Sequence, residues 1–465
     1  MGEISSNDRR YQALLALIVA VGLGLRIAGA QGGLWLDEAW SAVLTHDVGT
    51  PLGIFLNINH DNNHYLNSLW MHLVGFEAPS PLQRGLSIAS GTISILIAAR
   101  IGARSSTLVA LIAAALFAVS PLFVTYGSEA RGYAPMVLAL LVAILIVDRW
   151  LAGETERNPA MSLALCFFLG ALAQLTIVFG FFAISGWVFF TLWHRSSFRE
   201  AFAGSFRLMF RSLIAILLVL AMLLAAAIAH GGYKLGGFDA FTWALFLHGT
   251  LTMSEYALGY PVISIWWAVL IPALVILAPS LGVTRMAFHR LAILAFPLSL
   301  AVLHADNVQH PRYYLLAGIA LLILLAEMIS QGIRTGGWRR WLGAAALLAI
   351  LAGSLVQDID LATNRRSDTS AAIRALQARA PGGTRVFIDR DLARAALEVG
   401  AAQARYPLVI LARGCPETRF FFADRFQGET SAGAIRWCNR DYLPLAAGRA
   451  RGLSGTNWTL YEQRP

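Results

Sequence analysis

The chain has 465 residues, of which 57% are hydrophobic and only 14% are charged. Soluble globular proteins carry about 25% charged and about 45–50% apolar residues, so this composition excludes an ordinary soluble protein and a disordered chain. Three cysteines are too few for a secreted disulfide scaffold. The remaining class is a polytopic membrane protein. The formal net charge of +9 comes almost entirely from arginine, since Lys234 is the only lysine.

A hydrocarbon core about 30 Å thick needs about 20 mostly apolar residues for each membrane-spanning helix. The first apolar stretch follows Arg9 and Arg10 without a small-residue cleavage site, which indicates a retained helix rather than a removed signal peptide. The sequence predicts an α-helical polytopic membrane protein with about eleven transmembrane helices, at 11–28, 86–101, 107–125, 133–149, 161–175, 177–193, 212–229, 263–281, 291–303, 313–329 and 341–356.

The distribution of arginine between the short loops predicts the orientation of the chain. One set of loops carries fifteen arginines, whereas the other set carries only Arg84, Arg131, Lys234 and Arg312. Because arginine-rich loops stay on the cytoplasmic side, we expect a multi-pass protein of the bacterial inner membrane with a cytoplasmic N-terminus. The net positive charge therefore reflects the orientation of the chain in the membrane. The sequence has no basic patch interleaved with aromatic residues, so we expect no nucleic acid as a partner.

The first outer segment, about 29–85, contains a short apolar run at 64–76. This run is too short and too polar to span a bilayer, because His64, Asn67 and His72 interrupt it. An amphipathic helix lying in the outer interface fits better. A spanning helix here would also place Arg100 on the outer side, against the charge rule.

The last part of the chain, 357–465, differs in character from the membrane domain predicted for 1–356. The run SAAIRALQARA reads as a helix, and TRVFID, PLVILA and WTLYEQ read as strands. We expect a small extracytoplasmic α/β domain. Cys415 and Cys438 both lie in it, so a disulfide and two unpaired thiols are both open. Cys166 lies in a predicted membrane helix, where it would serve packing.

Acidic side chains gather on the predicted outer side, first in the run GGLWLDEAWS. Asp37 and Glu38 directly precede a short helical stretch. A purely structural role is open, in which Asp37 caps that helix and Glu38 lies in its first turn. The functional alternative is a catalytic carboxylate at the membrane surface.

A second polar cluster, NINHDNNHYLNS, holds His60, Asp61 and His64. A solvated loop with a helix cap would explain it. Alternatively, His60 and Asp61 together with Asp37 form a candidate site for a divalent metal ion. No fixed ligand spacing such as H-E-x-x-H is present. The pattern therefore leaves two alternatives open, namely no cofactor or a divalent metal ion.

Two further clusters lie at predicted outer helix ends. In VTYGSEARGYAP, Glu129 and Arg131 are expected to pair in part, as a simple ion pair at a helix start would. The run HADNVQHPRYYLL carries candidate ligands for a lipid phosphate, and the loop around Tyr233 adds one more cation. These candidates are His310, Arg312, Tyr313 and Lys234.

Acidic, imidazole and guanidinium groups thus converge on one face of the membrane. A transporter or flippase of lipid-linked glycans should instead place ionisable residues or broken helices near the midplane, where the predicted helices are almost free of charge. A non-catalytic assembly protein is a further alternative, and it predicts that the outer carboxylates are dispensable. The pattern favours a reaction site at the outer surface.

The runs LWLDEAWS, YGSEARGY and PRYYLLAG, in this order and on the same predicted side, resemble the GT-C membrane glycosyltransferases. The similar branch holds the dolichyl-phosphate-mannose protein mannosyltransferases and the bacterial aminoarabinose transferases (family 39-like). The resemblance covers about residues 10–330. Residues 60–67 depart from it, because prolines of the relatives are absent there.

The resemblance implies transfer of a hexosyl or pentosyl unit from a polyprenyl-phosphate-linked donor to an envelope lipid, glycan or protein. It implies Asp37 as general base with Glu38 as its partner. A base is needed because an acceptor hydroxyl is a poor nucleophile. The expected substrate-binding residues are Glu129, Arg131, His64, Lys234, His310, Arg312 and Tyr313.

Overall fold

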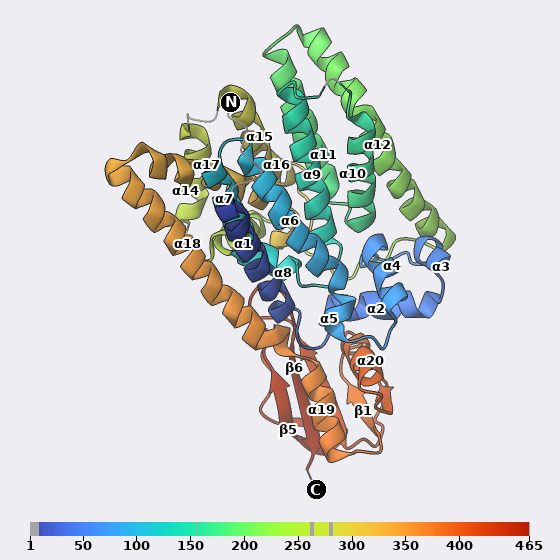
Figure 1. Cartoon of the computed structure of the whole chain (residues 1–465). Coiled ribbons are helices and arrows are strands. Elements are labelled where there is room, and N and C mark those ends of the chain that lie inside the picture. The colour runs from blue at the N-terminus through green and yellow to red at the C-terminus, as the bar shows by residue number, and fades with distance from the viewer. Residues whose placement is uncertain (1–8, 156, 261–264, 279–281, 465) are drawn as a thin grey trace.

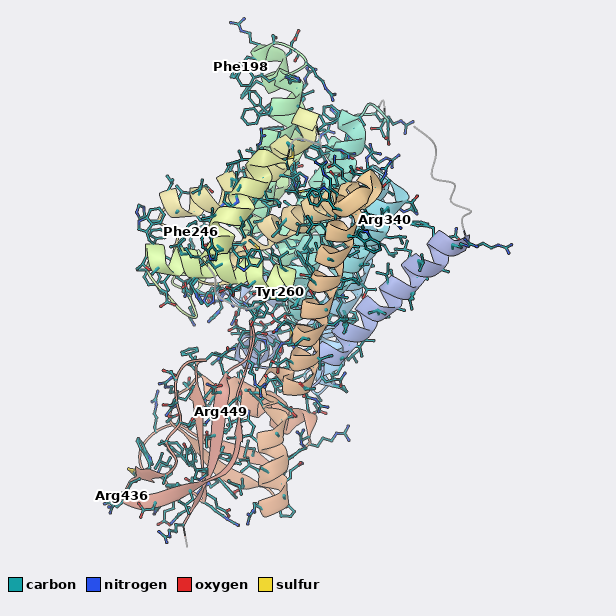
Figure 2. All side chains as sticks on the ribbon, turned by 90° about the vertical axis from the view of Figure 1, so that its left-hand side faces the viewer. Phe198, Phe246, Tyr260, Arg340, Arg436 and Arg449 are labelled. Atoms are coloured by element: carbon teal, nitrogen blue, oxygen red, sulfur yellow. A yellow bond between two sulfur atoms is a disulfide. The ribbon has the colours of Figure 1, made fainter. Side chains whose placement is uncertain are left out.

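The computed structural model describes residues 9–155, 157–260, 265–278 and 282–464. It shows a large helical domain and a small sheet domain at one end of it (Figure 1). The C-terminal end of α1, rather than its start, lies near the sheet domain (Figure 1). Figure 2 shows the same division from the side, with Phe198 and Arg340 in the helical domain and Arg436 and Arg449 in the sheet domain.

Within the described residues, seven helical segments are long and apolar enough to cross a membrane, and four shorter apolar helices accompany them. Together they overlap the eleven predicted stretches, of which residues 263–264 and 279–281 lie outside the described residues, although the count of eleven spans stays a prediction. The long segments are α1 (Arg9–Gly29), α6 (Gly85–Ala103), α9 (Tyr133–Leu151), α12 (Phe198–Ala229), the run of α15 (Gly282–Arg290), η1 (Leu291–Ala295) and α16 (Phe296–Val302), η2 (Pro311–Tyr314) with α17 (Leu315–Thr335), and α18 (Gly337–Asn364) with η3 (Arg365–Ser367). The shorter ones are α7 (Thr107–Val119), α10 (Ala160–Ala173), α11 (Ile177–Trp193) and α14 (Trp266–Leu277).

Two predicted boundaries were wrong. The stretch 107–125 is not one helix, because Pro121 lacks a backbone N–H and begins a separate helix, α8 (Pro121–Tyr126). The segment between the predicted helices 212–229 and 263–281, expected as the loop around Tyr233, contains α13 (Trp243–Leu258), which runs across the long helices (Figure 2). Thr242 caps the start of α13 by accepting from the Leu245 N–H at 3.1 Å.

The first outer segment forms four short helices between the long helices and the sheet domain (Figure 1). The helix predicted at 64–76 is confirmed as a ten-residue helix. These helices are α2 (Leu36–Val48), α3 (Pro51–Leu56), α4 (Tyr65–Val74) and α5 (Ser80–Gln83).

The sheet domain has six strands in the order β2-β1-β3-β6-β5-β4, and β1 runs parallel to both β2 and β3. The helix and the three strands predicted for this domain are confirmed, and the disulfide between Cys415 and Cys438 is formed. The elements are α19 (Ser370–Arg379), β1 (Thr384–Ile388), α20 (Ala393–Gln403), β2 (Leu408–Leu411), β3 (Phe420–Arg425), β4 (Ile435–Trp437), β5 (Arg440–Gly448) and β6 (Asn457–Gln463).

One buried arginine helps to hold the junction between the two domains. Residues Arg365–Asp368 all have positive φ, a region that is sparsely populated by residues other than glycine. Arg366 is only 1% exposed, and its guanidinium donates to the Gly29 carbonyl, to the Thr125 carbonyl at 3.0 Å and to the Ser128 hydroxyl at 2.8 Å. Arg366 Nε also donates to the Ser454 hydroxyl at 3.0 Å, so this side chain links the sheet domain to the helical domain.

Because the carboxyl of Asp424 is buried, we expect the stability of β3 against unfolding to depend on pH. Burial raises the pKa of Asp424 to about 6, and its hydrogen bond with Thr456 offsets this only in part. The unfolded-state pKa is about 3.9. Because the folded state binds the proton more tightly, stability should fall as pH rises from about 4 to about 6, by on the order of 3 kcal/mol. Asp424→Asn should remove this dependence.

Amide hydrogen exchange of the β3 peptides in the whole protein, corrected for intrinsic rates, measures this effect. We expect the wild type to lose protection between pH 4.5 and pH 7, and Asp424→Asn to keep it. Asp391→Asn, at a side chain that is 69% exposed, is the matched control and should behave as the wild type. Equal losses in Asp424→Asn and wild type would contradict the prediction.

Candidate active site

The structure brings Asp37, Arg131 and Arg312 together although they lie far apart in the sequence. Asp37 Oδ2 accepts a hydrogen bond from Arg131 Nη1 and one from Arg312 Nη1 at 3.3 Å. Asp37 stands in the first turn of α2, Arg131 in the turn before α9, and Arg312 in η2. The side chains of Asp37 and Arg312 are 19% and 21% exposed, so a ligand can reach both.

Arg131 is held in place by polar and aromatic neighbours. It donates to Asn62 Oδ1 at 3.1 Å and to His64 Nε2 at 3.4 Å, and it lies 5.1 Å from the centre of the Tyr133 ring. Burial lowers the pKa of His64 well below its usual value, and the Arg131 charge lowers it further. The His64 ring is therefore neutral and accepts from Arg131, so it orients the guanidinium.

Glu38 faces away from Asp37, into a fully buried ion pair with Arg84. Arg84 donates to both carboxylate oxygens, at 2.8 and 2.5 Å, and the Ala130 N–H donates to Oε1 at 2.6 Å. Oε2 also accepts a hydrogen bond from the Trp35 N–H at 3.2 Å. Glu38, rather than Asp37, therefore provides the side-chain acceptor for a backbone N–H at the start of α2. Burial by itself would raise the pKa of Glu38, but the Arg84 charge and hydrogen bonds hold it below its usual value.

Glu129 is also fully buried, and its nearest cation differs from the expected one. Its Oε1 lies 3.7 Å from Arg366 Nε, whereas Arg131 binds Asp37. The expected partial pairing of Glu129 with Arg131 is thus replaced by an approach to the domain junction. Burial raises the pKa of Glu129, and the Arg366 charge opposes this rise.

Of the remaining predicted ligands, Tyr313 and His310 lie beside Arg312, whereas no contact among the residues that the structure describes joins the Lys234 side chain to either arginine. Arg312 stands 5.8 Å from the Tyr313 ring centre. Burial and the Arg312 charge lower the pKa of His310 to about 3, so its ring is neutral. Lys234 contributes its backbone, since its N–H donates to the Asn59 carbonyl at 2.8 Å and its carbonyl accepts from the Asp61 N–H at 3.0 Å. Its side chain is exposed.

The candidate metal ligands do not gather. His60 Nδ1 lies 2.7 Å from Asp61 Oδ1, and Asp61 Oδ2 accepts from the Gly236 N–H at 3.1 Å, but Asp37 faces the two arginines instead. In the described part of the chain, no group of three or more His, Cys, Asp or Glu side chains could hold a metal ion. The residues therefore do not fit the metal site that the sequence suggested.

Three partners of the site were not assigned from the sequence. Asn62 was seen only as part of a polar run, Arg84 only as a loop charge, and Arg366 not at all. The one local signal for Arg366 is the pair Arg365–Arg366, which follows the last predicted apolar stretch after several polar residues, and basic residues are also common at ordinary helix C-termini.

Comparison with known proteins gives a result for the fold alone. No family model and no curated protein matches the sequence. Two solved structures of ArnT from Cupriavidus metallidurans, in the apo state and bound to undecaprenyl phosphate, are similar with TM-scores of 0.55 and 0.53 and sequence identities of 10% and 11%. Each alignment covers 97% of this chain and 98% of ArnT. An Archaeoglobus fulgidus oligosaccharyltransferase is less similar, with a TM-score of 0.44, 14% identity and coverage of 88% of this chain and 68% of its own.

The fold of this chain is thus similar to that of ArnT over almost the whole length of both chains.

Proposed function

We propose that this chain is an integral membrane glycosyltransferase that transfers a sugar from a polyprenyl-phosphate-linked donor to an envelope acceptor. The observation that carries the proposal is the position of the Asp37 carboxylate between Arg131 and Arg312, in a partly exposed site. Two guanidinium groups suit a phosphate, which they bind by charge-assisted hydrogen bonds. The likeness to a protein solved with undecaprenyl phosphate supports the same donor class.

In the proposed reaction, the acceptor oxygen attacks the anomeric carbon, and the bond from that carbon to the phosphate oxygen breaks. Arg131 and Arg312 stabilise the negative charge that develops on the departing polyprenyl phosphate. Asp37 takes the proton of the acceptor hydroxyl. When the donor phosphate occupies the guanidinium groups, the Asp37 carboxylate is released from them and can turn toward the acceptor.

The other residues have supporting roles in this proposal. His64 and Asn62 hold Arg131 for the phosphate, whereas Tyr313 and His310 flank Arg312. We assign Glu38 to positioning, because its carboxylate is occupied by Arg84 and is sealed from solvent.

The proposed setting is the outer face of the bacterial inner membrane. Helix α2, which carries Asp37, lies at the end of the helical domain next to the sheet domain (Figure 1). With a cytoplasmic N-terminus, as the arginine distribution predicts, this end and the sheet domain are extracytoplasmic.

Arg312→Ala should raise the KM for the lipid donor by about 10–100-fold. This increase corresponds to the binding free energy lost with one hydrogen bond to a charged group. The KM for the acceptor should change far less. Initial rates of the purified protein, with each substrate varied in turn, measure both constants. Arg436→Ala, at a side chain that is 72% exposed in the sheet domain, is the control. Equal increases in both KM values would mean that Arg312 has only a structural role.

Mass spectrometry of envelope glycolipids, glycans and glycoproteins, from cells with and without the protein, tests the proposed function and identifies the sugar and acceptor. We expect one glycosylated species to vanish without the protein and to return with the wild type but not with Asp37→Asn. An unchanged envelope, with lipid-linked sugar shifted between leaflets, would instead favour a flippase.

A further inference from the structure

A cavity of about 360 Å³ lies between the first outer segment and the sheet domain, away from the two arginines. One wall comes from the end of α2 and from Phe76, and the other from α20 and the start of β2. The lining residues that matter for its chemistry are His46, Asp47, Phe76, Glu398 and Tyr406.

The cavity is preformed, because its two walls are fixed to each other. Helices α2 and α20 share a buried apolar cluster that includes Val43 and Val399. Gln403 on α20 donates to the Ala78 carbonyl at 2.9 Å and accepts from the Ser80 hydroxyl at 3.1 Å. A rigid cavity of this kind costs little ordering when a ligand binds.

The walls combine aromatic faces with carboxylates. His46 stacks on Phe76 with 4.4 Å between ring centres, and Tyr406 adds a third ring. Burial raises the pKa of Glu398, Arg394 opposes the rise, and Asp47 adds to it, so the two carboxylates act on each other across the cavity. None of the described lining residues is Lys or Arg. The cavity therefore favours groups that donate hydrogen bonds and repels anions.

One helix connects this cavity to the candidate active site. Asp37 stands in the first turn of α2 and Asp47 in its last turn, and ten residues of helix span about 15 Å. A ligand that reaches from one end of α2 to the other is longer than a single sugar ring.

We propose that this cavity binds a remote, uncharged or cationic sugar unit of the acceptor while the acceptor's reacting hydroxyl lies at Asp37. This inference rests on the proposed function and deepens it, because it names the acceptor class as an extended, non-anionic glycan chain or glycan headgroup. The carboxylates of Asp47 and Glu398 accept hydrogen bonds from its hydroxyl or amine groups, and the rings of Phe76 and His46 pack against its apolar faces.

The test uses the whole protein and the acceptor identified by envelope mass spectrometry, prepared as the intact glycan and as its terminal sugar alone. Two variants address the cavity in different ways, since Asp47→Asn removes a charge and Ala402→Trp fills the space. We expect each to raise the KM for the intact acceptor about tenfold or more. The KM for the donor, and the KM for the single sugar, should stay within about twofold. Glu77→Gln, at an exposed carboxylate outside the cavity lining, is the control.

Trapping the ligand gives an independent readout. With a photo-crosslinking amino acid at Phe76 in membranes, we expect an adduct that carries sugar without phosphate. A phosphorylated or protein adduct, or cavity variants that match Glu77→Gln on the intact acceptor, would overturn the inference. If the wild type transfers sugar and the cavity substitutions leave the KM for the intact acceptor unchanged, this inference fails and the proposed function stands. If the wild type transfers no sugar, the proposed function fails.

Discussion

Asp37→Asn should reduce sugar transfer by about 10²–10⁴-fold, the usual contribution of a general base. The asparagine side chain has nearly the same shape and can still accept a hydrogen bond from Arg131, so the protein should insert and fold normally. It cannot take a proton from the acceptor hydroxyl. Initial transfer rates of the purified protein measure the loss, and its thermal unfolding midpoint shows whether the fold is intact.

Two further variants decide what a loss of activity at this position means. Asp37→Glu keeps a carboxylate and should retain more activity than Asp37→Asn, whereas Asp391→Asn, an exposed change in the sheet domain, should have no effect. A normally inserted and fully active Asp37→Asn protein would remove Asp37 as the base.

Glu38→Gln should instead destabilise the protein, by about 3–5 kcal/mol. It removes one partner of an ion pair whose two side chains are both 0% exposed, and it leaves the Arg84 charge buried without its counterion. Chemical denaturation of the purified protein, followed by tryptophan fluorescence, measures the loss. Transfer activity should decline only as far as the folded fraction declines.

The double variant Glu38→Leu with Arg84→Met is the matched control for that effect. Because it removes both charges, it should recover the part of the loss that comes from the unpaired Arg84 charge, whereas the Trp35 and Ala130 N–H groups still lack the Glu38 acceptor. If Glu38→Gln folds as stably as the wild type yet transfers no sugar, Glu38 acts in the chemistry and its assignment to positioning is wrong.

The helices were predictable because apolar length alone decides them. Each of the eleven predicted stretches contains a helix, since backbone groups in a bilayer must be satisfied within the segment. The break at Pro121 was missed because the surrounding residues are uniformly apolar and hide a helix end. Helix α13 was missed because its run, WALFLHGTLTMSEYAL, is too polar for a span and is stabilised by its cap at Thr242.

The gathering of Asp37, Arg131 and Arg312 was predictable from topology, because charged residues next to outer helix ends are confined to one side. Their pairing was not. Asp37 and Glu38 are neighbours in the sequence, but adjacent side chains on a helix point in directions about 100° apart, so one faces the arginines and the other faces Arg84. The partner of Glu129 is Arg366, which lies more than two hundred residues away in the sequence. No local pattern indicates such a contact.

Photo-crosslinking with a polyprenyl phosphate that carries a reactive group near its phosphate tests the central claim most directly. We predict adducts on the peptides that contain Arg131 and Arg312, competition by unlabelled polyprenyl phosphate, and loss of labelling in the double variant Arg131→Gln with Arg312→Gln. Labelling confined to the opposite end of the helical domain, or labelling that the double variant leaves unchanged, would contradict the account.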